Sequence, residues 1–243
     1  MPHRTAASSI LLSITLFRPA AVGAEKPQTA DELVARHIEA LGGPAKLDSI
    51  QTIRITGKSS FGTGSTKSRT VIEFKRPQKL RMDMTHEGKT IVQVLDGSTG
   101  WVIMSSAGKP TPVPMPPDVI ELMKDQADLR GALVDHRDKG YRIELSGKAE
   151  VNGSECHRLE VTKADGAVEH YFLDAESFLL VQVQGKRKFR GGENEYTILF
   201  GDYRDVDGLK VAHSLQGGLL TGDMTVEKVE INVEVPDSRF RKP

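Results

Sequence analysis

The chain is poor in cysteine, in long apolar runs and in excess charge of either sign. Its single cysteine, Cys156, excludes an internal disulfide, so burial of apolar side chains must hold the fold together. After the N-terminal segment, no apolar run approaches the roughly 20 residues of a membrane-spanning helix, which predicts a soluble protein. Lysine and arginine total 33, and so do aspartate and glutamate. The chain therefore lacks the basic excess that is typical of a nucleic-acid binder.

The common catalytic motifs are also missing. There is no His-Glu-x-x-His motif, no Gly-x-Ser-x-Gly motif and no glycine-rich phosphate loop. If Asp165-Gly166 centres a hairpin, His170 faces Val161 rather than His157, and this register forms no metal-binding pair. The triplet His136-Arg-Asp138 is interpreted as a solvated helix end. These observations predict a protein that is not an enzyme and uses neither a metal nor a cofactor.

The first 24 residues have the layout of a secretory signal peptide. A basic head with Arg4 precedes a mostly apolar stretch from Ala6 to Phe17, and small residues follow up to Ala24. We therefore predict cleavage after Ala24 and export to the periplasm. A lipoprotein would carry its acylated cysteine directly after the cut, and Cys156 is far from it.

The mature chain begins with a predicted amphipathic helix. Thr29 and Glu32 have the spacing of a capping box, in which each side chain satisfies a backbone amide of the first turn. Apolar residues recur at helical spacing up to Leu41, and Gly42-Gly43 then ends the helix. His37 lies on the apolar face and is interpreted as a partly buried histidine rather than a ligand.

Most of the remaining chain alternates apolar and polar residues, which predicts an antiparallel sheet with one buried face. Turn dipeptides suited to tight hairpins separate the runs. They are Glu87-Gly88, Asp96-Gly97, Asn152-Gly153, Asp165-Gly166, Gly191-Gly192, Asp207-Gly208 and Gly217-Gly218. Their spacing predicts a meander of about ten or eleven strands. No break in composition divides it, so residues 25–243 are predicted to be one domain.

A proline-rich segment interrupts the alternation. Five prolines lie between Lys109 and Pro117, and proline cannot donate to a strand ladder, so this segment is predicted to leave the sheet. Asp118 then has the position of an N-cap, and an apolar stripe predicts a helix down to about Asp135. Two interpretations stay open: the helix covers a sheet face, or it is a lid over a cavity. The candidate lid residues are Met115, Ile120, Met123 and Leu133.

The apolar side chains of the predicted sheet either line a ligand cavity or fill a core. Methionine suits both, because it adapts to irregular shapes. The candidate cavity residues are Ile72, Phe74, Leu80, Met82, Met84, Ile91, Trp101, Leu159, Val161, Phe172 and Phe200. A basic run at 186–190 is interpreted as an exposed hairpin tip, with contact to anionic headgroups or an acidic partner as the alternative.

Several short motifs follow one another along residues 25–243. They are Glu39-Ala-Leu-Gly-Gly43 with Leu47 and Ile50–Arg54, Phe74–Pro77 with Lys79 and Arg81, Asp96-Gly97 with Gly100-Trp101, Asp202-Tyr-Arg204 with Val206–Lys210, and Asp237–Pro243. In their order and spacing they resemble the outer-membrane lipoprotein-sorting (LolA-like) family, in its broad branch. The resemblance implies an α+β fold that is mainly antiparallel β: an unclosed barrel of about eleven strands, with an N-terminal helix and an inserted lid helix over its concave apolar face.

The resemblance also implies a function. In the carriers that give the family its name, the cavity holds acyl chains of lipoproteins, which an inner-membrane transporter loads and an outer-membrane receptor unloads. A soluble periplasmic carrier of lipoprotein or lipid acyl chains is therefore expected, with Arg54 and Arg81 as candidate polar residues of the cavity. A fold does not fix a function, so a periplasmic sensor or interaction module with a hydrophobic pocket is the alternative.

Overall fold

The structure is a computed structural model that describes residues 28–60, 67–105, 111–189 and 192–242. The predicted signal peptide, residues 1–24, lies outside the described residues. Helix α1 (Ala30–Leu41) begins at the predicted capping box: the Glu32 amide donates to Thr29 Oγ1 at 3.2 Å, and the Thr29 amide donates to Glu32 Oε2 at 3.0 Å. Gly42 ends α1, and helix α2 (Pro44–Ser49) follows. The prediction of the first helix is confirmed at both ends.

After these helices the chain builds one arm of a sheet. Its strands are β1 (Thr52–Ser60), β2 (Ser68–Lys75), β3 (Lys79–His86), β4 (Lys89–Asp96), β5 (Thr99–Ser105) and β6 (Val113–Pro114). Helix α3 (Pro117–Gln126) and a series of turns up to Gly140 then carry the chain across to the other edge.

The second arm returns from that edge to the middle of the sheet. Its strands are β7 (Arg142–Val151), β8 (Ser154–Thr162), β9 (Val168–Asp174), β10 (Leu180–Phe189), β11 (Gly192–Val206), β12 (Leu209–Gly218) and β13 (Gly222–Ile231), and a short 3₁₀ helix, η1 (Asp237–Phe240), follows.

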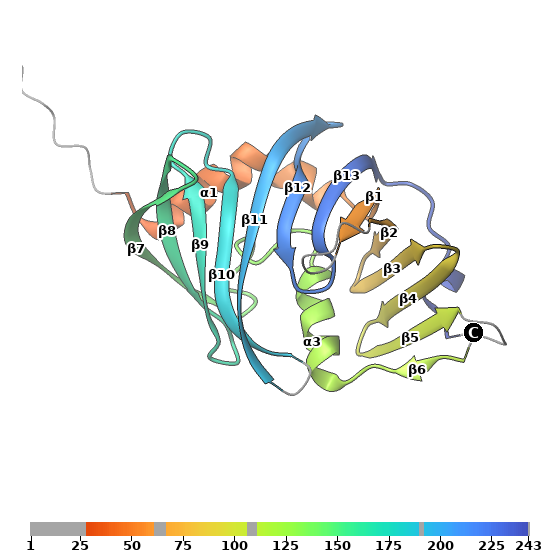
Figure 1. Ribbon diagram of the computed structural model, residues 1–243. Helices are drawn as coiled ribbons and strands as arrows, with labels where there is room; N and C mark the ends of the chain where they lie inside the picture. The colour runs from red at the N-terminus through yellow and green to blue at the C-terminus, as the bar shows by residue number, and fades with distance from the viewer. Residues whose placement is uncertain (1–27, 61–66, 106–110, 190–191, 243) are drawn as a thin grey trace, which may run out of the picture.

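All these strands belong to one antiparallel sheet (Figure 1). The order is β6-β5-β4-β3-β2-β1-β13-β12-β11-β10-β9-β8-β7, so strands that are adjacent in the sheet are consecutive in sequence except where β1 pairs with β13. The edge strands β6 and β7 are not paired with each other, and the barrel is therefore unclosed. Across the described residues the sheet has thirteen strands rather than about eleven. No helix there is both long and apolar enough to cross a bilayer.

One face of the sheet, which we call the inner face, is covered by the helices. Helix α1 packs Leu33 and Val34 against Leu159 and Val161, and α3 packs Leu122 and Met123 against the strands around Leu80. Between them, Leu47 and Ile50 pack against Ile53 of β1. The opposite, outer face is partly covered by the C-terminal segment, where Phe240 packs with Val94 and Trp101.

Tight turns form at most of the predicted dipeptides. Asn152 and Gly153 have φ angles of 51° and 84° between β7 and β8, and Asp207 and Gly208 have 51° and 82° between β11 and β12. Both pairs have the positive φ angles of type I′ hairpins. Gly217 is different, because it lies within β12 near a register shift. There the prediction of a turn is wrong, and the glycine marks a strand irregularity.

The central segment departs from its prediction in three ways. Val113 and Pro114 do not leave the sheet, because an edge strand tolerates proline, and they pair with Val102 and Trp101. Helix α3 begins two residues earlier, with Pro117 as its first residue, and its N-cap is Pro116 rather than Asp118. It ends at Gln126 rather than near Asp135. Beyond this end, Asp128 Oδ1 accepts from the Arg130 amide at 3.2 Å, a turn contact that competes with continued helix.

Candidate functional site

A cavity of about 740 Å³ lies between the inner face of β9–β11 and the segment formed by α3 and residues 127–132. This volume is within the range of pockets that hold small organic ligands, about 300–1,000 Å³. Its apolar lining comes from both sides of the gap: Leu122, Ala127, Leu129 and Ala132 from the covering segment, Leu180, Val183, Ile198 and Phe200 from the sheet, and Leu219 from the turn after β12.

Four of the charged side chains that line this cavity are joined by ion pairs, and we call them the cavity cluster: Asp125, Lys163, Glu169 and Arg187. Lys163 Nζ donates to Asp125 Oδ2 at 2.8 Å and to Glu169 Oε1 at 2.7 Å. Arg187 donates through Nε to Glu169 Oε1 at 3.1 Å and through Nη2 to Asp125 Oδ2. All four residues line the cavity. The side chains of Lys163, Glu169 and Arg187 are 7%, 2% and 13% exposed, so these three members of the cluster have little contact with water.

Two tyrosines complete the surroundings of Glu169. Tyr196 donates its hydroxyl to Glu169 Oε1 at 2.5 Å, and Tyr171 donates to Oε2 at 3.0 Å. Burial alone raises the pKa of Glu169, but attraction by Lys163 and the hydrogen bonds outweigh it, and the net effect is a lowered pKa. Glu169 is therefore a fixed anion at neutral pH, held by donors from four side chains.

Asp125 is the only member of the cavity cluster that α3 contributes. Burial raises its pKa and the attraction of Lys163 and Arg187 lowers it, with a net lowering. Its side chain is 34% exposed, far more than those of its partners. Asp125 is thus an ionised carboxylate at the solvent side of the cluster, and it ties α3 to the end of the sheet.

A close approach of two strands makes the cavity cluster possible. Gly185 of β10 pairs with Glu169 of β9, and a Cβ at Gly185 would lie 2.9 Å from Glu169 Cγ and 3.0 Å from Tyr196 Oη. A glycine inside a strand often marks such a close approach. The sequence interpretation missed the cluster, and Gly185 was the available signal.

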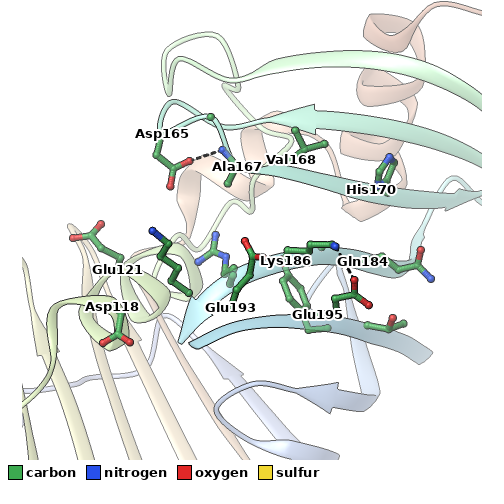
Figure 2. Close-up of a pocket in the computed structure, with 16 residues that line it drawn as sticks. Asp118, Glu121, Asp165, Ala167, Val168, His170, Gln184, Lys186, Glu193 and Glu195 are labelled. Atoms are coloured by element: carbon green, nitrogen blue, oxygen red, sulfur yellow. Dashed lines mark hydrogen bonds and ion pairs between the residues drawn. The ribbon is translucent and has the colours of Figure 1, made fainter. Parts of the chain in front are cut away.

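A second hollow, of about 950 Å³, lies at the ends of β9–β11. Figure 2 shows Asp118 and Glu121 of α3 on one side, and Lys186, Glu193 and Glu195 of the β10–β11 hairpin on the other. Lys186 pairs with Glu195 at 2.8 Å, which neutralises its charge. The predicted basic tip is therefore divided: Arg187 points to the inner face, Lys186 is paired, and Arg190 lies outside the described residues.

Most of the predicted cavity residues lie on the inner face, but they are packed in the hydrophobic core and do not line the cavity. Ile72, Leu80, Met82 and Met84 form one buried cluster, with Phe74 packed against it. Leu159 and Val161 lie beneath α1, with Phe200 partly buried beside them. Of this whole predicted set, only Phe200 lines the cavity.

Three predicted cavity residues have other surroundings. Trp101 packs on the outer face with Phe240, and Phe172 packs on the outer face with Val151 and Cys156, because alternation along their strands turns them away from the helices. Ile91 pairs with Met84 and is 41% exposed. For Trp101 and Phe172 the expectation of an inward side chain is wrong.

The two candidate arginines also lie on the outer face. Arg54 donates to Glu73 at 2.9 Å, and Arg81 donates to Asp83 at 2.7 Å. Arg239 from η1 joins both acids. These five residues form a charged network, here called the outer network, and neither Arg54 nor Arg81 reaches the cavity.

The candidate lid residues lie in two places. Met115 and Met123 are buried with Ile120 beside them in the cluster around Leu80. Leu133 follows the end of α3 and packs with Leu159 under α1.

The histidines lie close to their predicted positions, but the predicted strand register is shifted by one residue: His170 faces Glu160 rather than Val161, and His157 faces Leu173. His37 is buried and its Nδ1 lies 2.9 Å from the Phe178 carbonyl oxygen.

Comparison with solved structures identifies the fold. A LolA superfamily protein from Nitrosomonas europaea is 15% identical with a TM-score of 0.53, over 89% of this chain and 99% of that one. A DUF1329 family protein from Desulfovibrio piger is 13% identical with a TM-score of 0.56, over 87% and 97%. No family model matches the sequence, and no curated protein matches it. The chain has the LolA-like fold, and the resemblance inferred from its motifs is confirmed at that level.

Proposed function

We propose that this protein binds an acyl chain of a lipid or lipoprotein in the 740 Å³ cavity and carries it across the periplasm. The observation that carries the proposal is a cavity with apolar side chains on its sheet side and an amphipathic helix on the other side. Leu122 of α3 lines this space together with Val183 and Phe200 of the sheet, so the ligand would be held between the sheet and a helix that can separate from it.

The energetics of such binding require a cover that opens. Burial contributes roughly 0.8 kcal/mol per CH₂, so one long acyl chain would gain about 10 kcal/mol before ordering costs. Spontaneous release into water would then be slow, and handover to a receptor needs an opening. Helix α3 suits this role because it is short, it follows a proline-rich segment, and Asp125 ties its last turn to the sheet.

A binding role accounts for the cavity cluster better than a catalytic one does. The lowered pKa values of Asp125 and Glu169 keep both carboxylates ionised at neutral pH, whereas a general base works best with a pKa near the working pH. Export is supported by the residues before Ala24, whose pattern is that of a signal peptide.

A second candidate function, a sensor or interaction module, is favoured by an exposed apolar patch. Ile91, Met104 and Val113 are 41%, 61% and 53% exposed near the β6 edge. Site-specific photo-crosslinking from position 104 in cells would test it. A discrete protein adduct would support partner binding, and its absence together with bound lipid would leave the carrier role.

Two measurements test the carrier proposal. Native mass spectrometry of the protein purified from its own envelope should show bound acyl-containing species. The neutral fluorescent probe N-phenyl-1-naphthylamine should bind, and Ala132→Trp, which fills the cavity, should weaken its affinity by at least about tenfold. Ala149→Trp on the outer face is the matched control. A clean apo mass together with no probe uptake would overturn the proposal.

A further inference from the structure

We infer that Lys163 and Arg187 form a binding site for the carboxylate of a fatty acid, and that Asp125 of α3 occupies this site in the ligand-free protein. The inference rests on the proposed function and deepens it, because it assigns the ligand a charged end as well as an apolar chain. It also assigns α3 a second role, because this helix supplies the Asp125 carboxylate that the ligand would displace.

The charges of the cavity cluster support a replaceable anion. The sheet arm supplies Lys163, Arg187 and Glu169, whose charges sum to one positive charge in nearly dry surroundings. Asp125 supplies the missing negative charge, through Oδ2, to both cations. Buried charges must be compensated. When α3 moves away, the site requires another anion, and one carboxylate restores neutrality.

The position of Asp125 on its own helix supports the same conclusion. It lies in the last turn of α3, where the helix dipole disfavours a negative charge. Lys124, one residue earlier, carries the positive charge that the C-terminal end of a helix favours, and it pairs with Glu121. Asp125 therefore does not stabilise the helix by itself, and its contacts are with the two cations of the sheet.

The surroundings match the shape of a fatty acid. Lys163 and Arg187 line the same cavity as Leu180, Ile198 and Phe200. A carboxylate bound to the two cations would place its alkyl chain along this apolar wall. Glu169 cannot serve as the exchangeable anion, because it is 2% exposed and holds hydrogen bonds from both tyrosines.

The test compares oleate with oleyl alcohol, which has the same chain and no charge, by calorimetric titration below the micellar concentration. In the unaltered protein we expect oleate to bind about tenfold more tightly, because a hydrogen bond to a charged group adds roughly that factor. Arg187→Met should remove this preference and retain oleyl alcohol binding. Asp125→Asn should increase the preference, because the competing carboxylate is gone.

Glu121→Gln is the matched control, since it removes the same charge from α3 outside the cavity cluster, and it should leave the preference unchanged. Equal affinity of the unaltered protein for both ligands would overturn the carboxylate site while the acyl-binding proposal stands. A preference for oleate that persists in Arg187→Met would also overturn it. Binding of neither ligand would overturn both proposals. The first comparison uses the unaltered protein and does not depend on how a variant folds.

Discussion

The two halves of the inner face are built from similar alternating strands, yet α3 meets them differently. On the β2–β4 side, Leu80, Met82 and Met123 are almost completely buried against one another. On the β9–β11 side, the space beneath α3 is a cavity, and the four charged residues of the cavity cluster line it. The same helix is thus packed through apolar contacts on one side and held by ion pairs on the other.

This difference separates two kinds of attachment. Close packing is lost as a whole when two surfaces part, because dispersion contacts need near-contact distances. An ion pair can exchange one partner for another of the same charge. The β2–β4 side therefore anchors α3, and the β9–β11 side can open around a ligand. Substitutions on one side of α3, compared with matched positions elsewhere, test this difference.

The largest effect is expected from the buried acids. Glu169→Gln leaves Lys163 and Arg187 with too little negative charge in a dry site, and we expect a loss of about 3–5 kcal/mol in the free energy of unfolding. Glu73→Gln in the outer network should cost only about 1 kcal/mol, because its partners Arg54 and Arg239 are 27% and 37% exposed and can hydrate. Urea denaturation measures both. Equal losses would show that the two networks have the same role.

Leucine truncation compares the packing of the two sides directly. Leu80 is completely buried beneath α3, so Leu80→Ala should lower the free energy of unfolding by about 3 kcal/mol. Leu180 lines the cavity and is only partly buried, so Leu180→Ala should cost about 1 kcal/mol. A larger cost at Leu180 would mean that the cavity side is packed as tightly as the other.

The sequence predicted those parts of the fold that depend on local patterns. The capping box at Thr29 and Glu32 and the hairpin at Asn152-Gly153 each involve residues close in the chain. The end of α3 was missed because a turn contact of Asp128 stops a helix that the apolar stripe would continue. The position of Trp101 was predicted wrongly because both faces of its strand are covered by other parts of the chain. Alternation alone does not show on which of two covered faces an aromatic side chain lies.

The cavity cluster could not be predicted in the same way. Lys163, Glu169 and Arg187 each have the appearance of solvent-facing charges in an alternating chain. They meet only because β9 pairs with β10 and because α3 brings Asp125 across the sheet. These contacts join segments that are distant in the sequence, and no local pattern in any one segment predicts them.

Acid should act mainly on the cavity side. The pKa values of Asp125 and Glu169 are lowered in the folded state, from usual values of 3.8 and 4.5. Their stabilisation is therefore complete at neutral pH and is lost as pH falls below these values, because the unfolded chain then binds more protons. Acidification of the unaltered protein should lower the free energy of unfolding by less than Glu169→Gln does at neutral pH. The reason is that the carboxylates are protonated one after another, so part of the cavity cluster stays ionised.

Circular dichroism during urea denaturation, repeated from pH 7 down to pH 3, measures this dependence. Glu169→Gln should show a flatter acid decline than the unaltered protein. Glu73→Gln leaves the cavity cluster intact and should retain the full decline. An identical acid decline in all three proteins would show that other carboxylates govern the acid response.

A more moderate effect than that of Glu169→Gln is expected at Gly185, the glycine that makes room for the cavity cluster. Gly185→Ala would place a methyl group 2.9 Å from Glu169 Cγ, and such crowding typically costs about 1–3 kcal/mol. Gly201→Ala in β11 is the control, because its nearest neighbour, Ser214 Cβ, would be 4.0 Å away, and its cost should stay within about 0.5 kcal/mol. If the β9–β10 contact positions Glu169 for the two cations, Gly185→Ala should also reduce the preference for oleate over oleyl alcohol, and Gly201→Ala should not. A loss of stability at Gly185 with an unchanged preference would mean that the glycine serves strand packing alone.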